Sequence, residues 1–293
     1  MTTVGFIGTG RMGAPMAGHL LTAGYPLVVH DLHPGAARPL VERGAEWAAS
    51  PAEVARQVET IITIVPSSRE VEAVVGTMLP ALGPRHLLVE MTTADPSSTR
   101  RLAKDVAARG AAMIDAPVSG GVRGANEATL SIMVGGDAAD LERARPLLEK
   151  LGKKIFHVGG IGTGHAMKLV NNVTSAACLL ATAEAVVVAL RAGIDPARAV
   201  EILAASSGRS NASEWKFPQS ILTGRFDAGF TIALMNKDLA GFMRLADETG
   251  VEAPVAAAAA EYFRRAMQGP LAAEDHTAIV KLLGWPGGEG VRP

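Results

Sequence analysis

Several kinds of residue are scarce in this chain of 293 residues. Its single cysteine, Cys178, excludes an internal disulfide framework and a metal site built from several cysteines, and we expect no bound metal. Charged residues make up 19% of the sequence, and 28 Lys and Arg nearly balance 29 Asp and Glu, so the formal net charge is -1. This balance gives no electrostatic reason to expect nucleic acid or an anionic membrane surface as a partner. Because 48% of the residues are hydrophobic, a disordered chain is excluded as well.

A long apolar run is also missing. The longest aliphatic stretch lies between Ala176 and Leu190, is interrupted by Glu184, and is shorter than the ~20 residues that a membrane-spanning helix needs. The first residues lack the basic region of a signal peptide. We therefore expect a cytoplasmic protein without a membrane partner. At roughly 150 residues per domain, the length predicts two domains.

Short β-branched runs alternate with alanine-rich segments in the first 160 residues. The runs occupy residues 4–7, 27–30, 61–65, 87–90, 112–116, 130–134 and 155–158. In these runs the residues that would point to either face of a sheet are apolar, which is typical of strands that are buried on both faces. Helix-like segments between the first five runs predict a mostly parallel, doubly wound α/β sheet. The last runs lie closer together, and we expect them to add strands of a different direction at one edge.

The pattern changes after a cluster of four glycines between 159 and 164, beyond which no strand-like run appears. The spacing of apolar residues predicts one long helix over 164–192. Shorter helices are expected over 196–205, 214–222, 232–249 and 253–267, and the tail from Gly284 is expected to be loose. The sequence thus predicts a doubly wound domain over 1–162 and an all-helical domain over 163–293, joined by the long helix.

A glycine-rich turn, GxGxxG, follows the first predicted strand and precedes a predicted helix. Gly8 permits a tight turn, Gly10 lets the backbone approach a pyrophosphate, and Gly13 lets helix and strand pack closely. The N–H groups at the start of the helix would bind the phosphates. The turn in this context indicates a Rossmann dinucleotide-binding domain. The residues expected to hold the cofactor here are Gly8, Thr9, Gly10, Arg11, Met12 and Gly13.

The end of the second predicted strand indicates which dinucleotide is bound. Asp31 lies 23 residues after Gly8, where a carboxylate accepts hydrogen bonds from ribose hydroxyls and repels a 2′-phosphate. This favours NAD over NADP. His33 and Arg38 could assist a phosphate, so NADP is not excluded on the residues alone.

The segment DAPVSGGVRGA, residues 115–125, follows a predicted strand. The Ser119 hydroxyl with the N–H groups of Gly120 and Gly121 can form a small concavity that binds a carboxylate. The same residues are also compatible with an ordinary tight connection between two segments of a sheet, without a ligand. A carboxylate-bearing small molecule is therefore one of two interpretations at this point.

Two further segments contain lysines in predicted helices. In residues 162–172, Lys168 and Asn172 are four apart and share one helix face. Lys168 lies near the helix N-terminus, where a cation is disfavoured, so it is either functional or a lysine that reaches solvent. His165 precedes it and could cap or line the site. In residues 230–239, Lys237 with the adjacent aspartate is either functional or part of a surface ion pair.

Taken together, the four segments resemble the β-hydroxyacid dehydrogenase family, which includes 3-hydroxyisobutyrate dehydrogenases, tartronate semialdehyde reductases and the larger 6-phosphogluconate dehydrogenases. The matching letters are GFIGTGRMGAPMA, DAPVSGGVRGA, GTGHAMKLVNN and F-x6-KDL, in this order. The resemblance implies an N-terminal Rossmann domain, a long interdomain helix and an all-helical C-terminal domain that also forms homodimers or homotetramers.

The resemblance also implies roles for individual residues. Lys168 matches the catalytic lysine of the family, and Ser119, Gly120 and Asn172 match residues that bind the substrate. The positions that match cofactor-contacting residues are Val65, Pro66, Thr93 and Lys237. NADP-preferring members usually carry Asn-Arg-Ser/Thr where this chain has Asp-Leu-His at 31–33, which agrees with NAD.

The function implied is that of an NAD-dependent oxidoreductase. It would transfer a hydride between NAD and a small 3-hydroxyacid, similar to 3-hydroxyisobutyrate, or its semialdehyde, with Lys168 as general acid and base. Two alternatives stay open, an imine or other carbonyl reductase of the same superfamily and an NAD-binding module without catalysis. Residues 210–218 diverge from the family pattern near the expected substrate pocket, so the letters do not identify the substrate.

Overall fold

The computed structural model describes residues 2–286. The chain divides into two compact units, residues 1–168 and 169–293, each of which is described by itself. The sequence predicts its domain boundary at 162/163, six residues before this division.

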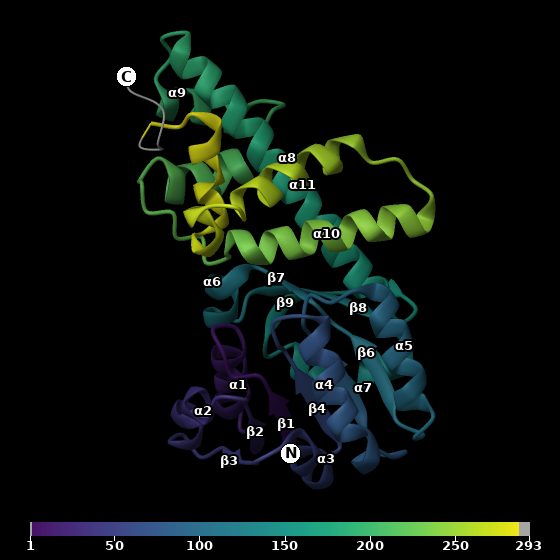
Figure 1. Ribbon diagram of the computed structural model, residues 1–293. Helices are drawn as coiled ribbons and strands as arrows, with labels where there is room; N and C mark the ends of the chain where they lie inside the picture. The colour runs from purple at the N-terminus through teal and green to yellow at the C-terminus, as the bar shows by residue number, and fades with distance from the viewer. Residues whose placement is uncertain (1, 287–293) are drawn as a thin grey trace. The chain divides into compact units, whose positions relative to one another are not determined.

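The first unit is built on a nine-stranded sheet in the order β3-β2-β1-β4-β5-β6-β8-β7, with β9 paired to β8 (Figure 1). The strands are β1 (Val4–Ile7), β2 (Leu27–His30), β3 (Glu46–Trp47), β4 (Thr60–Thr63), β5 (Leu87–Glu90), β6 (Ala112–Asp115), β7 (Val118–Ser119), β8 (Leu130–Gly135) and β9 (Gly152–Gly159). Strands β1 to β6 are parallel, whereas β8 runs antiparallel to β6 and β7. The predicted parallel sheet with differently directed edge strands is confirmed.

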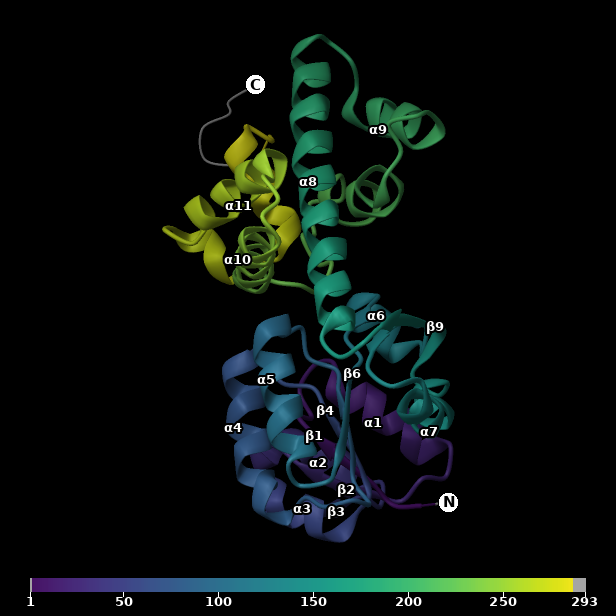
Figure 2. The ribbon, with the colours of Figure 1, turned by 90° about the vertical axis from the view of Figure 1, so that its right-hand side faces the viewer.

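Helices cover both faces of this sheet. The helices are α1 (Gly13–Thr22), α2 (Pro34–Val41), α3 (Pro51–Gln57), α4 (Ser68–Met78), α5 (Pro96–Ala107), α6 (Gly121–Asn126) and α7 (Ala138–Leu148), and a 3₁₀ turn occupies Leu79–Ala81. In Figure 2, α3, α4 and α5 lie on one side of the strands and α1 and α7 on the other. Each group packs its own cluster of buried aliphatic side chains against the sheet. Short polar residues, among them Ser50, Asp95 and Asp137, cap helix N-termini and explain where α3, α5 and α7 begin.

Two details of the sheet differ from the sequence prediction. Strands β3 and β7 have two residues each, too short to produce a recognisable apolar run. Strand β9 is largely exposed, with Phe156 at 50% and Val158 at 38%, so the expectation that it is buried on both faces is wrong. The reason is its position, because β9 pairs with β8 and not with the central strands.

The second unit is helical. Helix α8 (Thr163–Arg191) begins in the first unit and continues into the second, and it occupies the region of the predicted long helix. The other elements are α9 (Pro196–Ala205), a π-helical segment (Ala212–Ile221), α10 (Ile232–Thr249), α11 (Pro254–Ala266) and two 3₁₀ segments (Pro270–Ala273 and His276–Leu283). Phe217, Leu239 and Phe263 lie at the centre of the core, together with one face of α8.

Helix α8 corrects one expectation about apolar runs. It begins 13 residues before Ala176, and the full helix is long and apolar enough to cross a membrane by length and composition. Core helices pass the same test. Here Ala176, Leu179, Ala183 and Val186 of α8 are fully buried in the hydrophobic cluster of the second unit.

The expectation of a loose tail from Gly284 is wrong for Trp285. Trp285 is 8% exposed and packs edge to face on Phe217, with ring centroids 5.6 Å apart, so the chain is still part of the core one residue after Gly284. Residues 287–293, the rest of that predicted tail, lie outside the described residues.

Candidate active site

The glycine-rich turn joins β1 to α1 at the carboxyl edge of the sheet. Gly8 has φ +94°, and a side chain there would clash with the Ile64 carbonyl oxygen. A side chain at Gly13 would clash with the Gly8 carbonyl oxygen, so both positions require glycine for the fold itself. A Cβ atom at Gly10, by contrast, would meet no atom within 4 Å. The open space therefore lies at Gly10, where a dinucleotide pyrophosphate would approach the start of α1.

The carboxylate of Asp31 extends from the end of β2 to this turn. Its Oδ2 accepts hydrogen bonds from the Thr9 backbone N at 2.7 Å and the Thr9 hydroxyl at 3.2 Å, and its Oδ1 accepts one from the His33 N at 2.9 Å. These contacts hold the carboxylate beside the turn, where a ribose would donate to it. This arrangement fits a dinucleotide without a 2′-phosphate.

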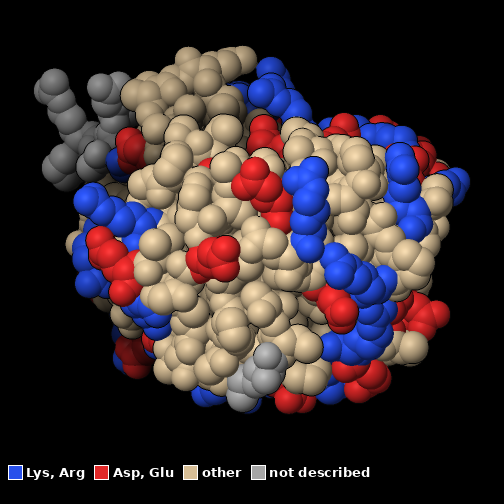
Figure 3. Space-filling model, turned by 90° about the horizontal axis from the view of Figure 1, so that it is seen from below, with Lys and Arg blue, Asp and Glu red and all other residues tan. Residues whose placement is uncertain are grey.

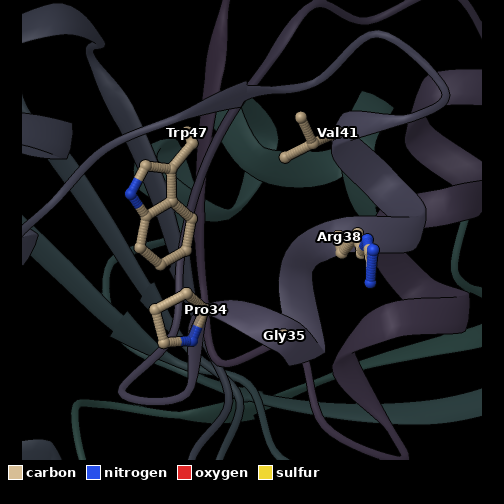
Figure 4. Close-up of a pocket in the computed structure, with 5 residues that line it drawn as sticks. All are labelled: Pro34, Gly35, Arg38, Val41 and Trp47. Atoms are coloured by element: carbon tan, nitrogen blue, oxygen red, sulfur yellow. The ribbon is translucent and has the colours of Figure 1, made fainter.

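A shallow hollow of about 360 Å³ lies next to this strand end and is lined by Pro34, Gly35, Arg38, Val41 and Trp47. Figure 4 shows Pro34 and Trp47 together on one side of the hollow and Arg38 on the other. Arg38 is exposed and pairs with Glu42 on its own helix at 3.4 Å. One of the two side chains that could assist a phosphate thus already has an acidic neighbour.

The other predicted cofactor residues follow neighbouring strands. The register pairs Ile7 of β1 with Thr63 of β4, and Thr63 with Glu90 of β5, so the chain leaves all three strands at one edge. Val65 and Pro66 follow β4 and Thr93 follows β5. The Val65 N donates to the Thr92 hydroxyl at 3.0 Å, which links the two loops. The first unit therefore brings the turn, the Asp31 carboxylate and these loops to the edge where ligands bind in doubly wound sheets.

Ser119 ends β7, Gly121 begins α6, and Gly120 joins them, at the edge of the sheet where the strands change direction. Gly120 has φ +131° and Gly121 has φ +60°, so two consecutive residues adopt conformations that favour glycine. A side chain at Gly120 would also meet Leu130 at 3.2 Å. The glycine pair is therefore required by the backbone of this connection, whether or not it also binds a carboxylate.

The start of α8 is fixed to the sheet by Asp115, the last residue of β6. Its Oδ1 accepts a hydrogen bond from the Gly162 N at 2.6 Å, and its Oδ2 accepts one from the His165 N at 2.7 Å. A side chain at Gly164 would clash with the Met133 carbonyl oxygen, so the helix begins directly against β8. Lys168, one turn further along α8, is 7% exposed. The interpretation of Lys168 as a lysine that reaches solvent is therefore wrong.

In the second unit, α8 and α10 meet through polar side chains. The Asn172 amide donates to Asp238 Oδ2 at 2.6 Å, and Lys237 Nζ lies 3.1 Å from Asp238 Oδ1. Asn171 donates to the Asn172 amide oxygen at 3.0 Å. Asp238 is 1% exposed, so the pair of Lys237 and Asp238 is not the surface ion pair that the sequence left open. The second unit thus brings Asn172 and Lys237 together around a buried carboxylate.

Sequence reasoning missed several buried polar residues. Glu90 and Asp115 are both fully buried, and each is the last residue of an apolar strand. A carboxylate at the end of an apolar run was the feature of the sequence that could have predicted them. Asp238 lies three residues after the buried Met235, a spacing that puts it on the inner face of α10. Lys216 is 4% exposed and donates to the Ser175 hydroxyl at 2.8 Å, and burial lowers its pKa to about 8. Among residues 2–286, no group of three His, Cys, Asp or Glu side chains is arranged to hold a metal ion.

Comparisons with known proteins agree with this organisation. Residues 3–159 match the family model for the NAD-binding domain of 6-phosphogluconate dehydrogenase, and residues 162–283 match the one for the NAD-binding region of NADP-dependent 3-hydroxyisobutyrate dehydrogenase. With the open space at Gly10 and the carboxylate of Asp31, these matches make NAD the cofactor.

Curated relatives match over almost their whole length. A 2-(hydroxymethyl)glutarate dehydrogenase of Eubacterium barkeri is 38% identical over 95% of this chain and 94% of its own. A 3-hydroxyisobutyrate dehydrogenase of Pseudomonas aeruginosa is 37% identical over 96% and 98%, and an NAD-dependent L-serine dehydrogenase of the same species is 37% identical over 97% and 98%.

A solved structure is similar at the same level. It is a 3-hydroxyisobutyrate dehydrogenase of Mycobacterium tuberculosis with L-serine, which has a TM-score of 0.91, 35% identity and coverage of 97% of this chain and 99% of that one. Hydroxyacid dehydrogenases thus match this chain along both units. On this basis the chain is an oxidoreductase that belongs to the β-hydroxyacid dehydrogenase family.

Proposed function

We propose that this protein catalyses the reversible oxidation of a small 3-hydroxyacid to its semialdehyde or ketoacid, with Lys168 as general acid and base. The observation that carries the proposal is the placement of Lys168. It is a buried lysine in the second turn of a helix whose start is hydrogen-bonded to the end of a strand, and Asn172 follows it one turn later on the same helix.

Each residue has one chemical task in this proposal. NAD, when bound, supplies the hydride acceptor. Lys168 Nζ accepts the hydroxyl proton during oxidation and returns it during reduction, so the amine must be neutral when oxidation begins. Asn172 orients the hydroxyl, while Ser119 and the N–H groups of Gly120 and Gly121 hold the carboxylate. Lys237 would contact the cofactor, as the family resemblance implies.

The substrate class follows from what the relatives' names have in common. In 3-hydroxyisobutyrate, L-serine and 2-(hydroxymethyl)glutarate, the carbon that carries the carboxylate also carries a hydroxymethyl group. The three compounds differ in the remaining substituent on this carbon. We propose the same core for the substrate of this protein. Residues 210–218, where the chain departs from the family pattern, would then select the substituent. Action on such a small polar acid suits the proposed cytoplasmic location.

A substrate panel tests the reaction class. Reduction of NAD+ would be followed with 3-hydroxyisobutyrate, L-serine, 2-(hydroxymethyl)glutarate and 3-hydroxypropionate, and with lactate as a control whose hydroxyl is on the carbon next to the carboxylate. We expect turnover of at least one 3-hydroxyacid and none of lactate. Reduction of a cyclic imine without oxidation of any hydroxyacid would favour the imine reductase alternative. NAD binding without turnover of any compound would favour the non-catalytic module.

The role of Lys168 has its own test. Lys168→Ala removes the only group to which the proposal assigns proton transfer, so kcat should fall by ~10²-fold or more while the Kd for NAD stays close to that of the wild type. Steady-state kinetics and calorimetric titration with NAD measure the two quantities. Wild-type turnover by Lys168→Ala would remove this residue from the mechanism.

A further inference from the structure

A buried cluster of charged groups lies at the start of α8, entirely within the first unit. The imidazole of His165 is 0% exposed, and so are the carboxylates of Glu90 at the end of β5 and Asp115 at the end of β6. His165 Nε2 lies 3.0 Å from Glu90 Oε2 and 2.8 Å from the Thr92 carbonyl oxygen. His165 Nδ1 lies 2.7 Å from the Thr99 hydroxyl and 3.7 Å from Asp115 Oδ2.

The neighbours of the ring determine where its protons are. Nε2 faces a carboxylate and a carbonyl, both of which only accept, so Nε2 must donate. The Thr99 hydroxyl donates to the Asp95 carbonyl oxygen at 3.0 Å, which leaves its lone pairs to accept from Nδ1. If the Thr99 hydroxyl donated to Nδ1 instead, Nδ1 would carry a lone pair and no proton. That lone pair would face the Asp115 carboxylate, which is unfavourable. Both nitrogens therefore donate, and the ring is an imidazolium.

Charge balance leads to the same protonation state. Glu90 from β5 and Asp115 from β6 face the ring with their carboxylates, and α5 contributes the Thr99 hydroxyl. Burial alone would lower the pKa of His165, but the hydrogen bond and charge of Glu90, with the charge of Asp115, raise it above its ordinary value. Burial raises the pKa of Asp115, against the opposing effect of His165. Two buried carboxylates without a counter-ion would be strongly unfavourable.

The cluster also fixes the backbone that carries the proposed acid and base. His165 is bound on its backbone N by Asp115 and on its side chain by Glu90 and Thr99, so three elements of the sheet unit bind one residue. Lys168 lies three residues later on the same helix. The rotation of the first turn of α8 about its axis, and hence the direction in which the Lys168 side chain leaves the helix, is set by these contacts.

We propose that His165 is a positioning residue, an imidazolium that fixes the first turn of α8 on β5 and β6 and so sets the direction of the Lys168 side chain. This inference rests on the proposed role of Lys168. It assigns His165 no contact with the substrate. Loss of the imidazolium would leave Glu90 and Asp115 without their counter-ion, and the turn would shift, while the glycine-rich turn that holds NAD would stay in place.

The protonation state can be measured without any substrate. Nitrogen NMR of protein labelled in its histidine rings, recorded at pH 8, should show one ring with both nitrogens protonated, and this signal should be absent from His165→Gln. His86, another buried histidine, whose Nε2 donates to the Ala55 carbonyl oxygen at 2.8 Å, provides the matched control, because the doubly protonated signal should persist in His86→Gln. A neutral His165 at pH 8 overturns the proposal.

Kinetics of matched variants test the positioning role. His165→Gln should lower kcat on the order of 10- to 100-fold with little change in the Kd for NAD, since a small misplacement of a catalytic group costs this much. The double variant with Glu90→Gln removes the uncompensated charge and should recover part of the loss. His86→Gln, which removes an equally buried histidine at the opposite end of β5, should reduce thermal stability without changing kcat.

The outcomes separate this inference from the proposed function. Equal effects of His165→Gln and His86→Gln on kcat would overturn the positioning role. Wild-type turnover by Lys168→Ala would overturn the proposed function while the NMR result for His165 stands on its own. If His165→Gln does not fold, Glu90→Gln replaces it in the test, because this variant keeps the His165 ring and the Asp115 carboxylate. In that variant the doubly protonated signal must disappear at a lower pH than in the wild type, and an unchanged titration would overturn the proposal.

Discussion

Single residues of the glycine-rich turn serve two different purposes, and the structure separates them. Gly8 and Gly13 are required because any side chain would clash with backbone atoms, whereas Gly10 has open space around it. The sequence pattern assigns all three to one motif. Only the tertiary structure shows which of them the fold requires and which is available to the ligand.

This separation predicts opposite behaviour for two similar substitutions. Gly13→Ala should lower the free energy of unfolding by about 1–3 kcal/mol, the usual effect of overpacking. Gly10→Ala should leave stability close to that of the wild type but raise the Kd for NAD about tenfold or more, corresponding to about 1.4 kcal/mol of binding. Thermal unfolding and calorimetric titration measure the two effects. Unchanged NAD binding by Gly10→Ala would show that the pyrophosphate does not approach this position.

Lys216 predicts an unusual dependence of stability on pH. Burial lowers its pKa to about 8 in the folded chain, below the ordinary value of 10.5, so the unfolded chain binds more protons between these two values. Stability should therefore rise as the pH is raised from about 8 to 10.5, because the cost of burying the ammonium disappears. The gain attributable to this group is on the order of 3 kcal/mol.

The matched variant is Lys216→Met, which keeps the length of the side chain and removes the charge. Denaturant unfolding of both proteins at pH 7.5 and pH 10 isolates the contribution of Lys216, since other groups titrate alike in the two chains. We expect the wild type to gain stability relative to Lys216→Met at the higher pH. A constant difference between the two proteins would contradict the assigned burial of the amine.

At the scale of elements, a buried polar contact joins two helices of the second unit. Helices α8 and α10 share the buried Asp238, which accepts from Asn172 and pairs with Lys237. Asp238→Asn keeps the shape but removes the charge, and we expect kcat/KM to fall about tenfold through loss of a charged hydrogen bond. Glu201→Gln on α9, which affects an exposed ion pair with Arg198, is the control and should have no effect. An equal effect of both variants would exclude a role for Asp238 in the site.

Element prediction succeeded where a local pattern decides the structure. The apolar runs that became β1, β2, β4, β5 and β6 and the long helix were recognisable because their periodicity is a property of neighbouring residues. The two-residue strands β3 and β7 carry no such periodicity. The exposure of β9 could not be read from its letters either, because it depends on which strand lies beside it.

At the scale of the whole molecule, the balance of charges gives no reason to expect nucleic acid or an anionic membrane surface as a partner. Figure 3 shows Lys and Arg interspersed with Asp and Glu over one face, in line with the net charge of -1. We propose, from the family resemblance, that the chain forms homodimers or homotetramers. Several apolar side chains of the second unit are exposed, among them Val188 at 68% and Val255 at 71%.

The assembly prediction is tested by the mass of the protein in solution. Light scattering during size-exclusion chromatography should give two or four times the chain mass at micromolar concentration. A mass equal to one chain across the concentration range would contradict it.

The sequence by itself determined most of the order of elements and the dinucleotide turn, since each follows from residues close together in the chain. The family resemblance then marked Lys168, Asn172 and Lys237 as candidates. Only the tertiary structure decided which polar groups are buried and how they are paired. Glu90, Asp115 and His165 are far apart in the sequence and meet because β5 and β6 end where α8 begins. Burial and pairing are properties of contacts between distant segments, and folding has to bring those segments together before a carboxylate acquires its counter-ion.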